Sequence, residues 1–361
     1  MNPRYKSFSW KTIPEDLYTR LGNSGLEISR IVLGCMSYGR KSWLDFVLED
    51  EDEVFTIMKK AYDSGIRTFD TSCNYSNGFS EILIGKFLKK YNIDRRTVVI
   101  LTKCFFPANE LDPDTNLLLP GTAEGSEYIN RHGLSRTNIL DSVDKSIERL
   151  GTHIDLLQIH RFDPNTPIEE TMEALHDVVK SGKVRYIGAS AMRAYQFVEM
   201  QHVAEIHGWT KFISMQSYYS LFYREEEDEM IAYCKKTGVG LIPFSPLAGG
   251  VLARPYDKRF NTTPRSSTPF SAGLFGLTQI TDQDKLLLSR VEELANKHKV
   301  NMATVAIAWC LAKDHNPILG LNKVERIDDA LAAIKLKLTD EEVAYLDEPN
   351  VSRKLPNLYN Y

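Results

Sequence analysis

The 361-residue sequence has no excess of one charge, no paired cysteine motif and no apolar run long enough to cross a membrane. Its 44 Lys and Arg against 48 Asp and Glu give a formal net charge of −4, which offers no basic surface to nucleic acid or anionic lipid. The five cysteines are odd in number, far apart and without a C-x-x-C pair, so neither a disulfide framework nor a zinc site is expected. The first residues, MNPRYKSFSW, lack the apolar core of a signal peptide. We therefore expect a cytoplasmic protein with no metal and with no nucleic-acid or membrane partner.

The sequence contains a regular alternation of short apolar runs and amphipathic helical stretches. Eight runs, many of them with β-branched residues, predict strands buried on both faces, and a helical stretch follows each one. Eight right-handed crossovers close into a (β/α)8 TIM barrel, with a doubly wound open sheet as the alternative. No linker-like segment divides the chain, so residues 1–361 are predicted to form one domain with its core at about 19–347. The predicted strands are 31–37, 67–72, 98–103, 155–160, 184–190, 212–216, 240–245 and 317–320. The predicted helices are 52–64, 80–90, 135–150, 168–181, 193–207, 224–236, 282–313 and 324–334.

Three features depart from a minimal barrel. Residues 19–30 contain a turn between two short alternating runs, which predicts a β-hairpin ahead of the first barrel strand. The connections 104–134 and 246–281 are long, and long loops in a compact domain are usually functional. Residues 338–346 place a threonine three residues before a glutamate, a capping-box spacing that predicts an extra C-terminal helix.

Four polar residues stand at or just beyond the ends of three consecutive predicted strands. Asp70 belongs to the end of the second strand and is followed by Tyr75, Lys103 ends the third strand, and His160 ends the fourth. Neighbouring strands lie about 4.8 Å apart, and in such barrels the site lies at the carboxyl ends of the strands. Taken singly, each residue also fits a structural role: a turn cap, a loop aromatic, a strand-end ammonium or a core histidine. Because all four fall at the same end of three successive strands, we interpret them as catalytic.

These four residue types suit proton transfer coupled to hydride transfer at a carbonyl group. A phenol has an ordinary pKa of about 10, so it is a poor acid–base group at neutral pH by itself. Lys103 would lower the pKa of Tyr75, and Asp70 would hold the ammonium in place. Tyr75 would then be the proton donor, and His160 would hydrogen-bond the carbonyl oxygen and stabilise its developing negative charge.

The chain resembles the aldo-keto reductases from the hairpin at residue 19 to the last helix near residue 347. The resemblance rests on the stretches FDTSCNYSNGFSE, VVILTK, DLLQIHRFD, VRYIGAS, FISMQSYYSLFYRE and LIPFSPLAGGVL in this order. GCMSYG, RYIGAS and SYYSLFYRE are most similar to the fungal aryl-alcohol dehydrogenase branch. The family's catalytic Asp, Tyr, Lys and His correspond to Asp70, Tyr75, Lys103 and His160. The resemblance implies an NADPH-dependent oxidoreductase that reduces aldehydes or ketones to alcohols.

The resemblance also implies a cofactor site for NADPH. Ser190 and Gln216 would hold the carboxamide, and the ring of Phe244 would stack on the nicotinamide. The Ser245 segment would follow the pyrophosphate with backbone donors, and Arg326 would contact the adenosine 2′-phosphate, which favours NADPH over NADH. The sequence departs from many family members at Ala191 and Ala330, where an asparagine is common. The full set of predicted cofactor residues is Ser190, Gln216, Phe244, Ser245, Leu247, Gly249, Gly250, Gly320 and Arg326.

Several aromatic or apolar residues follow the strands and are candidates for the substrate pocket. Their character suggests an aromatic or apolar aldehyde rather than a sugar phosphate, although packing of the long loops explains each of them equally well. The candidates are Met36, Tyr38, Trp43, Phe105, Phe106, Phe162 and Tyr219.

Other functions fit the sequence less well. No G-x-G-x-x-G motif follows a strand and no Y-x-x-x-K motif occurs, which disfavours Rossmann dehydrogenases. The alternative from another class is a cofactor-binding regulatory subunit of a membrane channel, with little turnover. The intact set of four catalytic residues favours an enzyme over that alternative.

Overall fold

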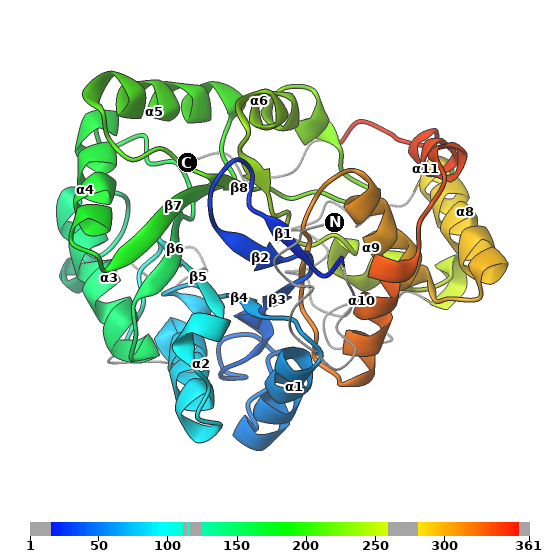
Figure 1. The fold of residues 1–361 in the computed structure, drawn as a ribbon, viewed down its shortest axis with the longest axis horizontal. Helices are drawn as coiled ribbons and strands as arrows, with labels where there is room; N and C mark the ends of the chain where they lie inside the picture. The colour runs from blue at the N-terminus through cyan, green and yellow to red at the C-terminus, as the bar shows by residue number, and fades with distance from the viewer. Residues whose placement is uncertain (1–15, 111–113, 116–124, 259–280, 354–361) are drawn as a thin grey trace, which may run out of the picture.

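The computed structural model of the protein describes residues 16–110, 114–115, 125–258 and 281–353. Eight parallel strands form one sheet in the order β10-β3-β4-β5-β6-β7-β8-β9. Figure 1 shows helices surrounding these strands. The strands are β3 (Val32–Gly34), β4 (Thr68–Asp70), β5 (Val99–Cys104), β6 (Ile154–Ile159), β7 (Val184–Ser190), β8 (Ser214–Gln216), β9 (Gly240–Leu241) and β10 (Ile318–Leu319).

The two ends of this sheet meet and close it into a barrel. The first strand, β3, pairs with the last, β10. On the other side of β10, the Ile318 amide donates to the Pro243 carbonyl at 2.9 Å, and Phe244 forms a parallel bridge with Ile318. The Asn316 amide adds a bond of 2.9 Å to the Leu241 carbonyl. The barrel prediction is therefore confirmed, and the open-sheet alternative is wrong.

The helices follow the strands in the expected alternation, and several begin at a side-chain cap. Asp50 accepts a hydrogen bond from the Glu53 amide at 2.8 Å at the start of α1, and Ser135 caps α3. The helices are α1 (Glu51–Asp63), α2 (Phe79–Lys90), α3 (Arg136–Leu150), α4 (Ile168–Lys180), α5 (Ala194–His207), α6 (Met230–Thr237), α8 (Asp282–His298), α9 (Met302–Ala312), α10 (Glu325–Lys335) and α11 (Asp340–Asp347). The extra C-terminal helix is confirmed as α11, with Thr339 and Glu342 forming the expected capping box.

One predicted helix is wrong, because residues 282–313 form two helices, α8 and α9. The chain leaves α8 at Lys299, which is in the left-handed conformation with φ 55°. Asn301 then caps α9 by accepting a hydrogen bond from the Thr304 amide at 2.8 Å. A residue in the left-handed region ends a helix, and an asparagine cap begins the next one. The continuous apolar pattern of residues 282–313 therefore does not indicate a single helix.

Some other predicted elements are shorter than expected. The segment 31–37 is a strand only as far as Gly34, and a 3-10 turn, Cys35–Ser37, follows it. The segment 224–236 begins with a 3-10 turn, Glu225–Glu227, before α6. Much of the two long predicted connections, 104–134 and 246–281, lies outside the described residues.

The predicted hairpin is present and packs against the amino-terminal end of the barrel. Strands β1 (Tyr18–Arg20) and β2 (Glu27–Ser29) pair antiparallel. Leu21 and Ile28 of the hairpin are fully buried, in one apolar cluster with the barrel residues Leu101 and Leu156. Gly22 has φ +57°, and a Cβ there would lie 2.3 Å from the Gly238 carbonyl oxygen. The hairpin therefore covers the amino-terminal end of the barrel, and Figure 1 shows β1 and β2 in front of the barrel strands.

No helix within the described ranges combines the length and the apolar character that crossing a bilayer requires.

Candidate active site

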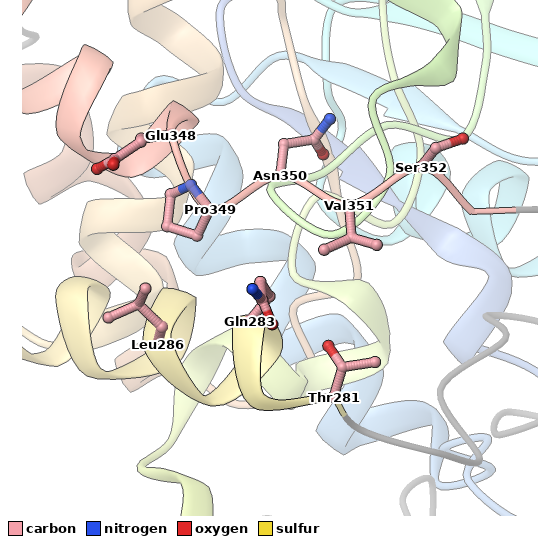
Figure 2. A pocket seen from close by; sticks show the side chains of 8 residues that line it. All are labelled: Thr281, Gln283, Leu286, Glu348, Pro349, Asn350, Val351 and Ser352. Atoms are coloured by element: carbon pink, nitrogen blue, oxygen red, sulfur yellow. The ribbon is translucent and has the colours of Figure 1, made fainter.

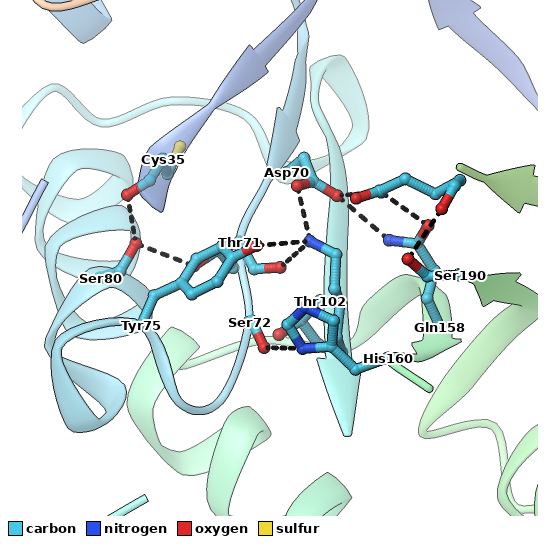
Figure 3. A network of polar contacts seen from close by, with 12 residues as sticks. Cys35, Asp70, Thr71, Ser72, Tyr75, Ser80, Thr102, Gln158, His160 and Ser190 are labelled. Carbon is cyan, nitrogen blue, oxygen red and sulfur yellow. Dashed lines mark hydrogen bonds and ion pairs between the residues drawn. The ribbon is translucent and has the colours of Figure 1, made fainter. Parts of the chain in front are cut away.

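The four predicted catalytic residues meet at the carboxyl ends of three adjacent strands, and Figure 3 labels three of them, Asp70, Tyr75 and His160. Asp70 is the last residue of β4, Lys103 lies near the end of β5, and His160 directly follows β6. The register aligns Asp70 with Leu101 of β5, so Lys103 lies two residues further along the neighbouring strand. The exposed fractions of the four residues are small: Asp70 3%, Tyr75 8%, Lys103 1% and His160 8%.

Tyr75 reaches this cluster because the chain after β4 turns sharply. Ser76 and Asn77 have φ of 48° and 50°, and Gly78 has φ of 88°, so three successive residues are left-handed. Such a conformation costs about 1–2 kcal/mol per residue other than glycine, and surrounding contacts must hold it. The Ser76 hydroxyl accepts from the Arg40 amide at 3.1 Å, and the Asn77 side chain donates to the Thr115 carbonyl at 2.7 Å. The turn ends at α2 and leaves Tyr75 beside Lys103.

Lys103 is the centre of the hydrogen-bond network. Its Nζ lies 2.6 Å from Asp70 Oδ2, 2.8 Å from the Thr71 carbonyl oxygen and 3.4 Å from the Tyr75 hydroxyl. Burial disfavours the charged ammonium, but the interactions with Asp70 and Tyr75 together outweigh burial, so the pKa of Lys103 lies above its usual value. Lys103 is therefore a fixed cation beside the phenol.

The pKa of Tyr75 is raised above 10, mainly because the phenol is buried. Lys103 lowers this pKa, as the sequence predicts, and Arg161 acts in the same direction. Neither effect overcomes burial. The predicted net lowering of the Tyr75 pKa is therefore not found, and the phenol is protonated at neutral pH.

His160 is held as a neutral imidazole. Burial comes first among the causes, and the nearby Arg161 and Lys103 cations add to it, so the pKa of His160 lies well below 6.5. The rings of His160 and Tyr75 are 5.9 Å apart between centroids, in an edge-to-face arrangement. The Arg161 guanidinium donates to the His160 carbonyl at 2.6 Å. A neutral His160 and a protonated Tyr75 can both form hydrogen bonds to one carbonyl oxygen. They do so without adding a positive charge to those of Arg161 and Lys103.

The second carboxylate oxygen of Asp70 is held by two amide side chains. Gln158 and Gln216 donate to Asp70 Oδ1 at 3.1 and 2.9 Å, and Gln216 also donates to Gln158 Oε1 at 2.9 Å. The Ser190 hydroxyl donates to the Gln216 carbonyl at 2.8 Å. The structure thus brings Ser190 and Gln216 to the four-residue cluster. Gln158 is not among the predicted site residues, although a glutamine inside the apolar run DLLQIH was an available signal.

The predicted cofactor segment after β9 has an unusual backbone. Ser245, Gly249 and Gly250 have φ of 54°, 68° and 98°. A Cβ at Gly250 would meet nothing within 4 Å, so the conformation and not crowding calls for glycine there. The Phe244 ring is half-buried and lies 5.7 Å from the ring of Tyr218. Leu247 accepts from the Gly250 amide at 2.9 Å, which closes the turn.

The other end of the predicted cofactor site carries positive charge. Arg326 on α10 is half-buried and bonds to the side chain of Asn322. Burial, followed by the nearby Arg254 guanidinium, lowers the pKa of Arg326. Two guanidinium groups close enough to oppose each other's charge suit a phosphate dianion. Gly320 is exposed directly after β10.

The residues present fit a nicotinamide dinucleotide. Phe244 offers an aromatic face, the turn at 245–250 offers left-handed backbone, and Arg326 with Arg254 offers cations. In addition, the Ser217 hydroxyl, next to Gln216, is buried without a hydrogen-bond partner in the described parts of the chain. A buried hydroxyl of this kind can form a hydrogen bond with a polar group of a bound ligand.

Part of the predicted substrate pocket surrounds Tyr75 and His160. Trp43 lies 5.9 Å from the Tyr75 ring, and Met36 packs on the same small apolar cluster. Phe106 lies 5.1 Å from the His160 ring, and the Phe105 ring lies 5.0 Å from that of Phe106. These four residues form an aromatic and apolar wall beside the catalytic cluster.

The other three pocket candidates contact other parts of the fold. Tyr219 stacks on Trp309 of α9 with 5.1 Å between ring centroids. The Tyr38 hydroxyl donates to the Leu321 carbonyl at 2.5 Å, which ties it to the segment after β10. Phe162 is partly buried against the main apolar core. These contacts are with a helix, the segment after β10 and the core, and the place of the three residues in the pocket stays a prediction.

An open groove lies apart from the catalytic cluster. It has a volume of about 620 Å³ between the start of α8 and the segment after α11 (Figure 2). No predicted catalytic or pocket residue lines it, so we do not assign it to the active site. Its lining residues are Thr281, Gln283, Leu286, Glu348, Pro349, Asn350, Val351 and Ser352.

A parallel barrel with its buried polar cluster at the carboxyl ends of the strands has the layout of an α/β-barrel enzyme. Residues 30–350 match the model of the aldo/keto reductase family, and the chain belongs to that family. It is 56% identical over 344 residues to a Schizosaccharomyces pombe protein provisionally named an aryl-alcohol dehydrogenase, covering 94% of this chain and 97% of the relative. It is 51% identical over 339 residues to the versiconal hemiacetal acetate reductase of Aspergillus parasiticus, covering 94% and 98%. The protein is therefore an oxidoreductase-family member, as its resemblance to the fungal branch indicated.

Proposed function

We propose that this protein is an NADPH-dependent reductase of aldehydes and ketones, with Tyr75 as the proton donor. The observation that carries the proposal is the buried row of Asp70, Lys103 and Tyr75, with 2.6 Å and 3.4 Å between successive polar atoms. A purely structural role for the buried Lys103 ammonium would need only the Asp70 carboxylate as its partner. Proton transfer to a carbonyl group also needs the Tyr75 phenol beside that ammonium.

Each of the four residues has one task in the proposed reaction. Tyr75 donates its hydroxyl proton to the carbonyl oxygen as negative charge grows there. Lys103 stabilises the phenolate that Tyr75 becomes, and Asp70 fixes the ammonium, itself held by Gln158 and Gln216. His160, kept neutral, stabilises the same oxygen by hydrogen bonding. A bound NADPH would supply the hydride.

We assign the cofactor to the far side of the barrel mouth from the tyrosine loop. Phe244 would lie against the nicotinamide ring, and Ser190 and Gln216 would contact its carboxamide. Ser245, Leu247, Gly249 and Gly250 would follow the pyrophosphate, with Gly320 nearby. Arg326 would bind the 2′-phosphate, which is the reason to favour NADPH over NADH.

The wall of Met36, Trp43, Phe105 and Phe106 supports an aromatic or otherwise apolar aldehyde as substrate. Flat apolar rings beside the catalytic cluster favour a ligand of the same character. The names of the yeast and Aspergillus relatives, an alcohol dehydrogenase and a reductase, agree with this substrate class. A kinetic panel of benzaldehydes against small sugar aldehydes tests it, and a clear preference for the sugars would contradict it.

The decisive experiment compares the protein with its Tyr75→Phe variant. NADPH oxidation with benzaldehyde is expected to fall by about 100-fold or more, the usual contribution of a general acid. NADPH binding, followed by fluorescence titration, is expected to stay unchanged because the ring and its packing are kept. Equal turnover by the variant would remove Tyr75 as the acid. Tight NADPH binding with no turnover by either protein would instead favour the channel-subunit alternative.

A further inference from the structure

Two buried polar residues behind His160 have no task in the proposed reaction. Ser72 and Asn74 follow β4 between Asp70 and Tyr75, and their exposed fractions are 0% and 3%. The Ser72 hydroxyl lies 2.6 Å from Asn74 Oδ1 and 3.3 Å from His160 Nδ1. Figure 3 shows Ser72 directed at the imidazole ring. The three side chains therefore form a chain of hydrogen bonds that ends on a proposed catalytic residue.

Counting protons along this chain gives the state of the imidazole ring that goes with this orientation of the Asn74 amide. The Ser72 hydroxyl has one proton, and in the structure it donates that proton to Asn74 Oδ1. Its bond to His160 Nδ1 must then be an acceptor bond, so the ring proton is on Nδ1. Because burial, and then the Arg161 and Lys103 cations, oppose a second proton on the ring, Nε2 carries none. In this arrangement His160 accepts hydrogen bonds at Nε2 and cannot donate one.

A half-turn of the Asn74 side-chain amide reverses every bond in the chain. Asn74 Nδ2 is buried and has no hydrogen-bond partner among the residues that the structure describes. After the half-turn Nδ2 would donate to Ser72, Ser72 would donate to His160 Nδ1, and the ring proton would move to Nε2. Both orientations of the Asn74 amide give the same number of hydrogen bonds, so this number favours neither of them.

We propose that Asn74 acts through Ser72 as a positioning residue that decides which ring nitrogen of His160 carries the proton. In the arrangement of the structure, Nε2 accepts from a hydroxyl group and suits an alcohol ligand. In the turned arrangement, Nε2–H donates to an oxygen without a proton and suits a carbonyl ligand. The meaning of the two arrangements for catalysis rests on the proposed function, but the link between Asn74 and the ring proton does not.

Nitrogen-15 NMR of the imidazole rings tests that link without any cofactor or substrate. The full chain has eight histidines, and the His160 signals are assigned by their loss in His160→Gln. The unaltered protein is expected to show the proton on Nδ1. Asn74→Asp can only accept from Ser72, so it is expected to keep the proton on Nδ1. Asn74→Leu frees the Ser72 proton for Nδ1, so the ring proton is expected to move to Nε2.

The same His160 spectrum in all three proteins would overturn the proposal, and so would a proton on Nε2 in Asn74→Asp. Ser72→Ala is a second route, since it breaks the chain with a small change in volume. Its expected result is loss of the Nδ1–H preference, and retention of that preference would count against the proposal. Asn350→Asp, an exposed change that adds the same charge, is expected to leave the His160 spectrum unaltered.

Benzaldehyde reduction then separates this proposal from the proposed function. Asn74→Asp is expected to lower kcat by about 100-fold, as the loss of one donor to a reacting oxygen does. Asn74→Leu is expected to retain most of kcat, because its Nε2–H is already in place. If the ring proton moves as expected but kcat is the same in both variants, the link holds and the donor role of His160 fails.

Discussion

Burial of His315 makes the stability of this barrel sensitive to mild acid. The side chain is 2% exposed, and neither ring nitrogen has a hydrogen-bond partner in the described parts of the chain. Its ring lies 4.5 Å from the ring of Tyr219. Burial first, and then the nearby Lys235, lower the pKa of His315 to about 3. The folded protein therefore keeps this imidazole neutral at pH values where an exposed histidine is charged.

The size of the effect follows from proton linkage. Between pH 6.5 and about 3 the unfolded chain takes up a proton on His315 that the folded chain does not. Stability is lost as pH falls through this window, by about 1.4 kcal/mol per pH unit. At pH 5 the loss is about 2 kcal/mol relative to pH values well above 6.5. For a chain of this length, that is a fall of about 3 °C in Tm.

The assay compares the protein with His315→Phe, which keeps an aromatic ring but cannot take a proton. Urea unfolding and thermal melts at pH 7 and pH 5 are expected to show the extra loss only in the unaltered protein. His160, whose pKa is also depressed, contributes equally to both proteins and cancels in the comparison. His202→Gln, at an exposed position, is expected to behave like the unaltered protein. The same pH dependence with and without His315 would refute the reasoning.

Three further predictions concern single side chains. Lys103→Met removes the cation that opposes the raised pKa of Tyr75, so the pH profile of alcohol oxidation is expected to move to higher pH; an unmoved profile would contradict the coupling. Arg326→Ala is expected to weaken NADPH binding by about 10- to 100-fold in a titration, because charge-assisted bonds contribute about 1.5–3 kcal/mol, while NADH binding stays the same; an equal effect on both cofactors would count against a 2′-phosphate contact. Glu81→Gln removes the buried carboxylate 2.7 Å from the Arg149 guanidinium and leaves that guanidinium only the partly exposed Glu110 carboxylate, so it is expected to cost about 3 kcal/mol in urea unfolding, whereas the exposed Glu348→Gln is expected to cost little.

Much of the fold could be predicted because local pattern and global architecture agree. Alternating apolar runs and helices fixed the barrel order, and the Thr339 spacing located α11. The break between α8 and α9 was missed because apolar periodicity continues across it. Only the left-handed Lys299 and the cap at Asn301 mark the break, and both residue types also occur inside helices.

The site could be predicted in part, because strand ends share one side of a barrel. That rule brought Asp70, Lys103 and His160 together, but it says nothing of how deeply they are buried. Burial depends on loops from distant parts of the chain, and it reverses the expected net change in the Tyr75 pKa. Likewise, an aromatic residue after a strand can face the site or the outer packing, and Tyr219 contacts Trp309. The catalytic and cofactor roles themselves stay predictions.

The hairpin of β1 and β2 has a consequence for how ligands enter and leave the barrel. Its Leu21 and Ile28 are buried against barrel residues at the amino-terminal end of the described barrel, so we expect ligands to reach Lys103 from the carboxyl-terminal end. A dinucleotide and a small carbonyl compound would then enter the barrel through the same end. Whichever lies deeper has to arrive first and depart last, so we expect an obligatory sequence of arrival, which product-inhibition patterns would reveal.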